Sequence, residues 1–209
     1  MPLNYPVGSS RDFEQLEPGS HIALCNMVVD LGLQLGSAMY PQPKQQVYIR
    51  FEVPGERITY EKDGIEVEGP ITIGQTYTAS MNAKATLRKH LESWRGRAFT
   101  DEEAGTFDVA SILGKTCLLL VSSHTSQTTG KTRSVIAGMG KAPKGIMEVE
   151  AENPLLYYDK TSSLETFNRL PKWLQEKIGA QLVQESAKHS ASQQPEQAGT
   201  GFEDDDIPF

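Results

Sequence analysis

The sequence has few cysteines and no long hydrophobic run, and both shortages narrow the class of protein. The chain of 209 residues has only Cys25 and Cys117, which lie far apart within apolar sequence. We therefore expect buried, reduced thiols and neither a disulfide framework nor a zinc site. No stretch approaches the roughly 20 apolar residues of a transmembrane helix. The N-terminus also lacks the basic and apolar regions of a signal peptide, so we expect a cytoplasmic protein without a membrane partner.

Residue patterns of enzyme sites are also missing. The histidines fall at no metal-ligand spacing; they are His21, His90, His124 and His189. Gly130-Lys131-Thr132 is similar to the end of a phosphate-binding loop, but that loop needs a glycine where Thr125 stands. No nucleophile, base and acid can be grouped into a catalytic triad. The sequence therefore predicts no catalytic residue, no metal, no cofactor and no enzymatic activity.

Charge is present but segregated. The net charge is −7, yet residues 81–144 contain ten basic and five acidic residues. Residues 186–209 contain one base and five acids. The local field, not the total charge, decides whether a phosphate backbone can bind. A basic body segment and an acidic tail are therefore compatible with a nucleic-acid partner.

Hydrophobic periodicity predicts a mainly β protein. Apolar sequence favours strands at residues 21–35, 46–53, 71–79, 115–123 and 133–138, with Gly32 as a bulge or bend in the first. Residues 82–95 change to helical spacing. Five strands with a helix between the third and fourth are the order of the OB-fold, a small β-barrel that binds oligonucleotides. We therefore expect an OB-fold-like barrel.

The cleanest alternation is in residues 46–53. Four apolar side chains would face the core: Val47, Ile49, Phe51 and Val53. Three others would face outward: Tyr48, Arg50 and Glu52. Residues 54–70 are charged and glycine-rich, which predicts a long loop that could contain a short hairpin. Thr100 to Glu103 has the pattern of a capping box, and residues 126–132 that of a turn.

The chain divides by composition into successive parts. We predict an N-terminal arm (1–20), the DNA-binding domain (21–150), a helical extension (151–189), a flexible linker (190–201) and an acidic tip (202–209). Within the extension, residues 163–189 have helical spacing, and Pro171 would break or start a helix there.

The tip combines four acidic residues with Ile-Pro-Phe and the C-terminal carboxylate. Like charges repel and nothing here can form a core, so we expect disorder. Phe209 could fill a small apolar pocket of a partner while the carboxylate and the acids meet basic residues at its rim. The alternative is a purely solubilising acidic tail.

The last six residues, Asp-Asp-Asp-Ile-Pro-Phe, resemble the C-terminal tip of bacterial single-stranded-DNA-binding proteins. The resemblance is specific only over residues 202–209, and the body does not show that family's sequence in detail. Longer loops, a larger N-terminal arm and the helical region suggest a divergent relative, with a bacteriophage origin left open. The resemblance implies coating of single-stranded DNA during replication, recombination and repair. It also implies recruitment of replication and repair enzymes through the tip, which comprises Phe202, Glu203, Asp204, Asp205, Asp206, Ile207, Pro208 and Phe209.

Binding of a single strand requires a basic groove and flat side chains on which bases stack. One candidate cluster comprises Lys84, Arg88, Lys89, Trp94, Arg95 and Arg97. A second comprises Lys131, Arg133, Lys141 and Lys144, and Tyr48 and Arg50 project from a strand. Each has a structural alternative, because Trp94 at helical spacing could belong to the core and the basic helix face could be merely solvated.

The sequence leaves two functions open. The first is coating of single-stranded DNA without strong sequence preference, in which the acidic tail also competes for the basic surface. The second is a bacteriophage protein-interaction module that uses the tip to capture host repair proteins and binds no DNA. The sequence leaves the oligomeric state open, a homo-oligomer included.

Overall fold

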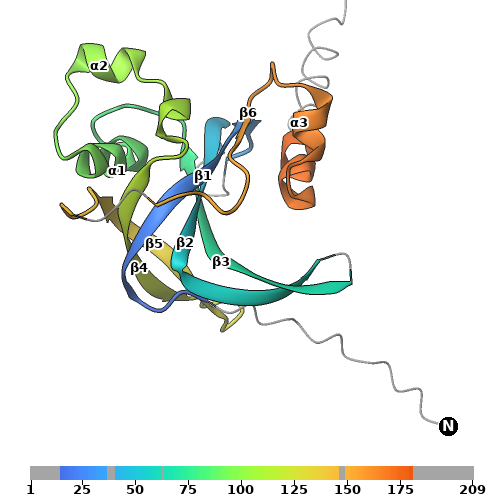
Figure 1. The fold of residues 1–209 in the computed structure, drawn as a ribbon. Helices are drawn as coiled ribbons and strands as arrows, with labels where there is room; N and C mark the ends of the chain where they lie inside the picture. The colour runs from blue at the N-terminus through green and yellow to red at the C-terminus, as the bar shows by residue number, and fades with distance from the viewer. Residues whose placement is uncertain (1–14, 37–40, 63, 146–148, 181–209) are drawn as a thin grey trace, which may run out of the picture.

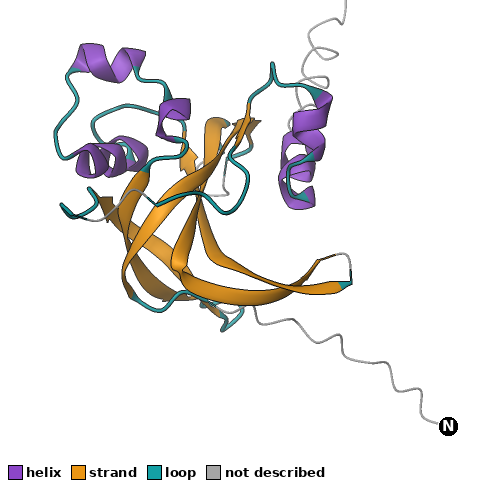
Figure 2. Cartoon of the chain, viewed as in Figure 1, coloured by secondary structure: helices purple, strands orange, loops and turns teal. Residues whose placement is uncertain are grey.

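The computed structural model describes residues 15–36, 41–62, 64–145 and 149–180. These residues are mainly β, with a few short helices, as Figures 1 and 2 show. The long strands are β1 (Gly19–Gln34), β2 (Lys44–Lys62), β3 (Ile65–Thr78), β4 (Thr116–Thr125) and β5 (Thr132–Gly140). Between β3 and β4 lie α1 (Thr86–Arg95), α2 (Asp101–Thr106) and the 3-10 turn η1 (Val109–Ile112). After β5 come β6 (Leu156–Tyr158), α3 (Leu164–Asn168) and a helical segment at 172–180.

The long strands form one antiparallel sheet in the order β3-β2-β1-β4-β5, and β6 pairs with β1 in parallel. The sheet curls strongly into a half-barrel, which brings β3 into contact with β5 (Figure 1). Irregular pairing contributes to the curl, because a bulge bends its strand and increases the local twist. The bulge predicted at Gly32 is confirmed: the β1–β2 register shifts between Asp30 and Gly32, and Gly32 has a φ of 68°.

The concave side of the sheet holds the main core. Val47, Ile49, Phe51 and Val53 are all buried there, as their alternation predicts. Leu87, Leu91 and Trp94 close the core from α1. The helix thus contributes one apolar face, at the spacing that the sequence indicates.

A second core lies on the opposite side of β1 and β2. Met27, Val29, Leu31 and Tyr48 from the strands pack against residues that follow β5, which are Leu156, Leu170, Leu174 and Ile178. Both sides of β1 are therefore buried, which explains why its sequence is almost continuously apolar and alternates only in part. The segment 156–178 covers a sheet face that the sequence predicts to be open.

Residues 54–70, predicted as a long loop that could contain a short hairpin, form a long two-stranded hairpin arm, so the hairpin is confirmed and is longer than expected. Strands β2 and β3 stay paired from Arg57↔Pro70 to Lys62↔Ile65, beyond a register shift after Val53. The arm projects away from the half-barrel in Figure 1. Its apolar alternation is limited to Ile58 with Tyr60 and Ile65 with Val67, and these runs are too short to predict paired strands of this length. Cross-strand pairs such as Arg57 Nε with Glu68 Oε1, at 3.0 Å, help to hold it.

The C-terminal helical region is confirmed in part. Pro171 separates α3 from the segment 172–180, as predicted. The linker 190–201 and the tip 202–209 lie outside the described residues, as does most of the N-terminal arm. None of the described helices has the length and apolar character needed to cross a membrane.

Candidate nucleic-acid interface

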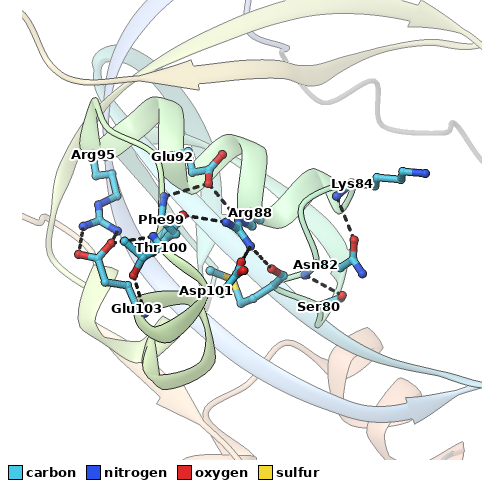
Figure 3. Close-up of polar contacts among 11 residues, drawn as sticks. Ser80, Asn82, Lys84, Arg88, Glu92, Arg95, Phe99, Thr100, Asp101 and Glu103 are labelled. Atoms are coloured by element: carbon cyan, nitrogen blue, oxygen red, sulfur yellow. Dashed lines mark hydrogen bonds and ion pairs between the residues drawn. The ribbon is translucent and has the colours of Figure 1, made fainter.

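Arg88 of α1 is a structural residue rather than an open cation. Its side chain is buried, and Nε donates to Glu92 Oε1 at 2.9 Å. Its two terminal nitrogens donate to the carbonyl oxygens of Met81 (3.1 Å) and Phe99 (2.8 Å). Figure 3 shows this guanidinium at the centre of the contacts that join α1 to the following loop. Its charge is already compensated, so its predicted contact with DNA gains no support from the geometry.

Arg95 and Arg97 share one carboxylate. Glu103 Oε1 lies 3.1 Å from Arg95 Nη2 and 2.8 Å from Arg97 Nη1. The Thr100 N–H and then the guanidinium of Arg95 are the main causes that lower the pKa of Glu103 to about 2. Glu103 also completes the predicted capping box with Thr100, which is confirmed (Figure 3). The arginines of the first candidate cluster thus serve the local fold.

This arrangement predicts an acid-dependent loss of stability. A carboxyl group with a lowered pKa stabilises the fold fully at pH values above its ordinary pKa of 4.5, and it loses that effect as the pH falls through the lowered pKa of about 2. Glu103→Gln retains the capping-box acceptor but removes the charge. The melting temperature of wild type should therefore exceed that of the variant at pH 7, and the gap should close between pH 4.5 and 2.

Glu102→Gln is the matched control, because Glu102 is an exposed neighbour in the same helical turn. Thermal unfolding followed by circular dichroism at several pH values measures both differences. A gap for Glu103→Gln that stays constant from pH 7 to 2 would contradict the assignment.

Tyr48 is not an exposed platform, so the prediction that it faces open solvent is wrong. It does lie on the side of β2 opposite the main core, but only 9% of it is exposed. Its ring crosses Gly74 of β3, where any Cβ would collide with it. Trp173 from the segment 172–180 packs edge-on against the same ring at 5.0 Å between centroids. The predicted alternation of β2 is correct, but the segment 172–180 covers the face on which Tyr48 lies.

Arg50 and Glu52 are also withdrawn from solvent. Arg50 Nε donates to Asn26 Oδ1 at 3.1 Å, and burial lowers the pKa of Arg50. Glu52 has no exposed surface. It accepts hydrogen bonds from Asn26 Nδ2 (3.0 Å), the Glu152 N–H (2.7 Å), and the N–H (3.1 Å) and Nδ2 (2.7 Å) of Asn153. Glu52, predicted to face outward, is a buried anchor for the chain after β5.

Trp94 belongs to the main core, as its helical spacing allows. It is 9% exposed, its ring lies 5.7 Å from that of Phe51, and Nε1 donates to the Thr116 carbonyl at 2.9 Å. A side chain held by core packing and by a hydrogen bond cannot rotate out to stack on a base without opening the core. Its predicted stacking role therefore gains no support.

The remaining predicted cations are exposed and form no ion pair with a carboxylate of the described residues. These are Lys84, Lys89, Lys131, Arg133, Lys141 and Lys144. Lys84 points away from the contacts of Arg88 in Figure 3. The run 131–144 is split by β5, whose nine residues put Lys131 and Arg133 about 30 Å from Lys141. The structure thus places two small cationic groups at opposite ends of the β4–β5 hairpin.

Two further residues, Lys115 and Trp173, are not among the candidates predicted from the sequence. Lys115 precedes β4, whose start pairs with the end of β5, so it lies at the same end of the hairpin as Lys141. Trp173 is 47% exposed and rests on Tyr48 of β2, which makes it a surface aromatic on the face of the sheet that carries Tyr48. In the sequence, helical spacing groups Trp173 with core residues. Only its packing in the folded chain shows that about half of the side chain is exposed.

The geometry also bears on the two cysteines, on a possible metal site and on the Gly-Lys-Thr sequence. Cys25 and Cys117 are free and buried, as predicted, and burial raises the pKa of Cys25 to about 12. Among the described residues, no cluster of histidine, cysteine or carboxylate side chains could hold a metal. Gly130 lies in the turn between β4 and β5 with a φ of 67°, so the Gly-Lys-Thr sequence does not lead into a helix there.

No protein-family model matches the chain, and neither a curated protein nor a solved structure resembles it significantly.

Proposed function

We propose that this protein binds and coats single-stranded DNA without strong sequence preference and recruits partner enzymes through its C-terminal tip. The observation that carries the proposal is the strand path. A curled sheet in the order β3-β2-β1-β4-β5, with β3 near β5 and a helix between β3 and β4, is the arrangement expected of an OB-fold. Because a fold alone does not define a function, the proposal also needs a surface suited to a strand of DNA.

The exposed cations supply part of that surface. Lys131 and Arg133 border the turn of the β4–β5 hairpin, a loop that can flank the oligonucleotide groove of an OB-fold. Unpaired cations gain most from phosphate contact, because no protein carboxylate has to be displaced. In this proposal these two residues contact the backbone, and Arg88, Arg95 and Arg97 support the fold.

A stacking surface is the second requirement, and Trp173 meets it better than Tyr48 or Trp94. Its exposed ring is held edge-on by Tyr48, so part of its orientation is fixed before a base arrives. Stacking on an aromatic ring is worth about 1–3 kcal/mol per base and tolerates every base. Stacking on Trp173 is therefore consistent with binding without sequence preference.

Fluorescence anisotropy with a labelled poly-dT oligonucleotide tests the proposal. We expect binding at low salt that weakens steeply as salt rises, since counterion release accompanies each phosphate contact. We also expect weaker binding to a duplex of the same length. Absence of binding at low salt would contradict the proposal and favour the protein-interaction module that captures repair enzymes without binding DNA.

A chain that ends at Gly201 separates the two activities. Without residues 202–209 it should bind poly-dT as tightly as the full chain or more tightly, because the removed acids repel phosphate. It should lose capture of replication and repair enzymes. Loss of DNA binding on this truncation would contradict the division of labour.

A further inference from the structure

A cavity of about 380 Å³ opens between α1, η1, the start of β4 and the loop that follows β5. Its apolar lining comes from several elements and comprises Leu91, Trp94, Phe99, Phe107, Ile112 and Ala142. Binding sites for small molecules have volumes of about 300–1,000 Å³ and are lined mainly by apolar and aromatic side chains. The cavity therefore has the size and the lining of a site for one compact molecule.

The aromatic walls of the cavity are held in place before a ligand arrives. Phe99 packs edge-on against Phe107, with 4.9 Å between the ring centroids. Trp94 Nε1 donates to the Thr116 carbonyl at 2.9 Å, and its ring also contacts Phe51 in the core. Aromatic rings attract one another edge-to-face or in offset stacks, and a wall that is already ordered adds little entropic cost to binding. These walls favour a flat aromatic ligand.

The charged lining is cationic. Arg95, Lys115 and Lys141 contribute to it, and no carboxylate of the described residues does. Glu103 already compensates Arg95 at 3.1 Å, as Figure 3 shows. Lys115 and Lys141 form no ion pair within the described part of the chain. The stem of Lys141 lies beside Gly96 at the end of α1, where an added Cβ would be 3.8 Å from its Cδ.

The neutral polar groups of the lining have partners within the protein. The Ser111 hydroxyl donates to the Asp108 carbonyl at 2.6 Å, and the Thr116 hydroxyl accepts from the Val149 N–H at 3.3 Å. The two lysine ammonium groups are therefore the charges of the lining that remain for a ligand. An ammonium acts as a point charge with rotatable donors, so it can meet an anion without a fixed geometry. The lining thus selects an aromatic molecule with one anionic group.

We propose that this cavity is a binding site for a small aromatic carboxylate. The ring system of the ligand packs against Trp94, Phe99 and Phe107, and its carboxylate stays at the rim, where Lys115 and Lys141 meet it. The site is separate from the cations assigned to DNA, which border the opposite end of the β4–β5 hairpin. It therefore adds a small-molecule ligand to the proposed function and does not depend on DNA binding.

The two tryptophans of the chain report on the test. Trp94 lines the cavity, whereas Trp173 lies on the other side of the sheet against Tyr48. Full-length protein labelled with ¹⁵N is titrated with 2-naphthoate while the indole N–H signals are followed. We expect the Trp94 signal to shift and saturate, with half-saturation at about 1 mM or below, and the Trp173 signal to stay unchanged. The neutral 2-naphthamide, which has nearly the same shape, should bind about tenfold more weakly.

Variants separate the charge of the rim from the apolar cavity. The double substitution Lys115→Gln and Lys141→Gln should weaken 2-naphthoate binding by a factor of the order of ten and leave 2-naphthamide binding nearly unchanged. Lys84→Gln with Lys160→Gln is the matched control, because it removes two exposed lysines that do not line the cavity. Ala142→Phe fills the cavity and should abolish the response of Trp94 to both compounds. The melting temperature of each variant shows whether it is folded.

A Trp94 signal that does not move at about 10 mM 2-naphthoate would overturn the proposal. Equal affinities for 2-naphthoate and 2-naphthamide would overturn the anionic ligand, and an equal response of Trp173 would show adsorption to exposed rings instead of a site.

Other occupants of the cavity would also be detected. Displacement of 2-naphthoate by poly-dT would make the cavity part of the DNA path, and a ligand-free Trp94 signal that changes with protein concentration would show a second copy in it. Either result would overturn a small-molecule site. The titration itself contains no DNA, so its failure is distinguishable from failure of the DNA-binding proposal.

Discussion

Glu52→Ala should destabilise the protein by about 3 kcal/mol or more, because the carboxylate is fully buried and accepts four hydrogen bonds. Its loss leaves the N–H groups of Glu152 and Asn153 without acceptors. It also leaves the charge of Arg50, withdrawn from water, without its nearby carboxylate. Truncation of a buried charged group is among the most costly single substitutions.

The loss should begin with the segment after β5. Glu52 holds residues 152 and 153 to β2, and these precede β6 and the residues of the second core. Hydrogen exchange should therefore show early opening at 152–158 and around Leu174, ahead of the main core. Release of this segment uncovers Tyr48 and its apolar neighbours on β1.

Chemical denaturation measures the change in free energy of unfolding. Glu56→Ala is the matched control on the same strand: its carboxylate is half exposed and makes a single contact, at 3.4 Å, with Nδ1 of the more buried His21, so its loss should cost much less. Glu52→Gln retains one oxygen acceptor and should fall between the two. Equal stability of Glu52→Ala and Glu56→Ala would contradict the anchoring role.

The double substitution Lys131→Ala and Arg133→Ala should reduce the salt dependence of DNA binding. Each phosphate contact to single-stranded DNA contributes about 0.7 to the slope of log K against log salt, so loss of two contacts lowers the slope by about 1.4. Affinity at low salt should fall by a factor of the order of ten. Both residues are exposed beside a turn, so the fold should not change.

The matched control is Arg57→Ala with Arg97→Ala, which also removes two cations. Arg57 is paired with Glu68 and Glu152, and Arg97 with Glu103. Because these charges are already compensated, the control should leave the slope nearly unchanged. Anisotropy titrations with poly-dT at four or more salt concentrations give both slopes. Equal reductions in the two double variants would show that net charge alone matters and would contradict a specific contact at the hairpin.

Local features with a clear pattern are well predicted from the sequence. The alternation of Val47, Ile49, Phe51 and Val53 places these four residues in the core, because a strand with one strongly apolar face has only one favourable register. The capping box and the bulge at Gly32 are likewise confirmed, since each is decided by neighbouring residues.

Features that depend on distant segments are predicted less well. The face of β2 that carries Tyr48, Arg50 and Glu52 is predicted to be exposed because these side chains are polar or amphipathic. Residues a hundred or more positions later nevertheless cover it. The arm at 54–70 has only short apolar alternations, Ile58 with Tyr60 and Ile65 with Val67, which do not distinguish a long hairpin from a loop. The run from Lys131 to Lys144 looks continuous in the sequence, but an extended strand separates its two ends.

The sequence by itself determined the β-rich class, the segregation of charge and the chemistry of the terminal tip, because these follow from composition and from contacts between near neighbours. The tertiary structure alone decided which charged side chains are exposed and which are paired or buried. It paired Arg88, Arg95 and Arg97 with carboxylates, buried Tyr48 and Glu52 under the C-terminal segment, and brought Lys115 and Lys141 to one apolar cavity. The reason is physical: the free energy of a charge depends on the groups within a few ångströms of it in space, and folding brings those groups from distant parts of the chain.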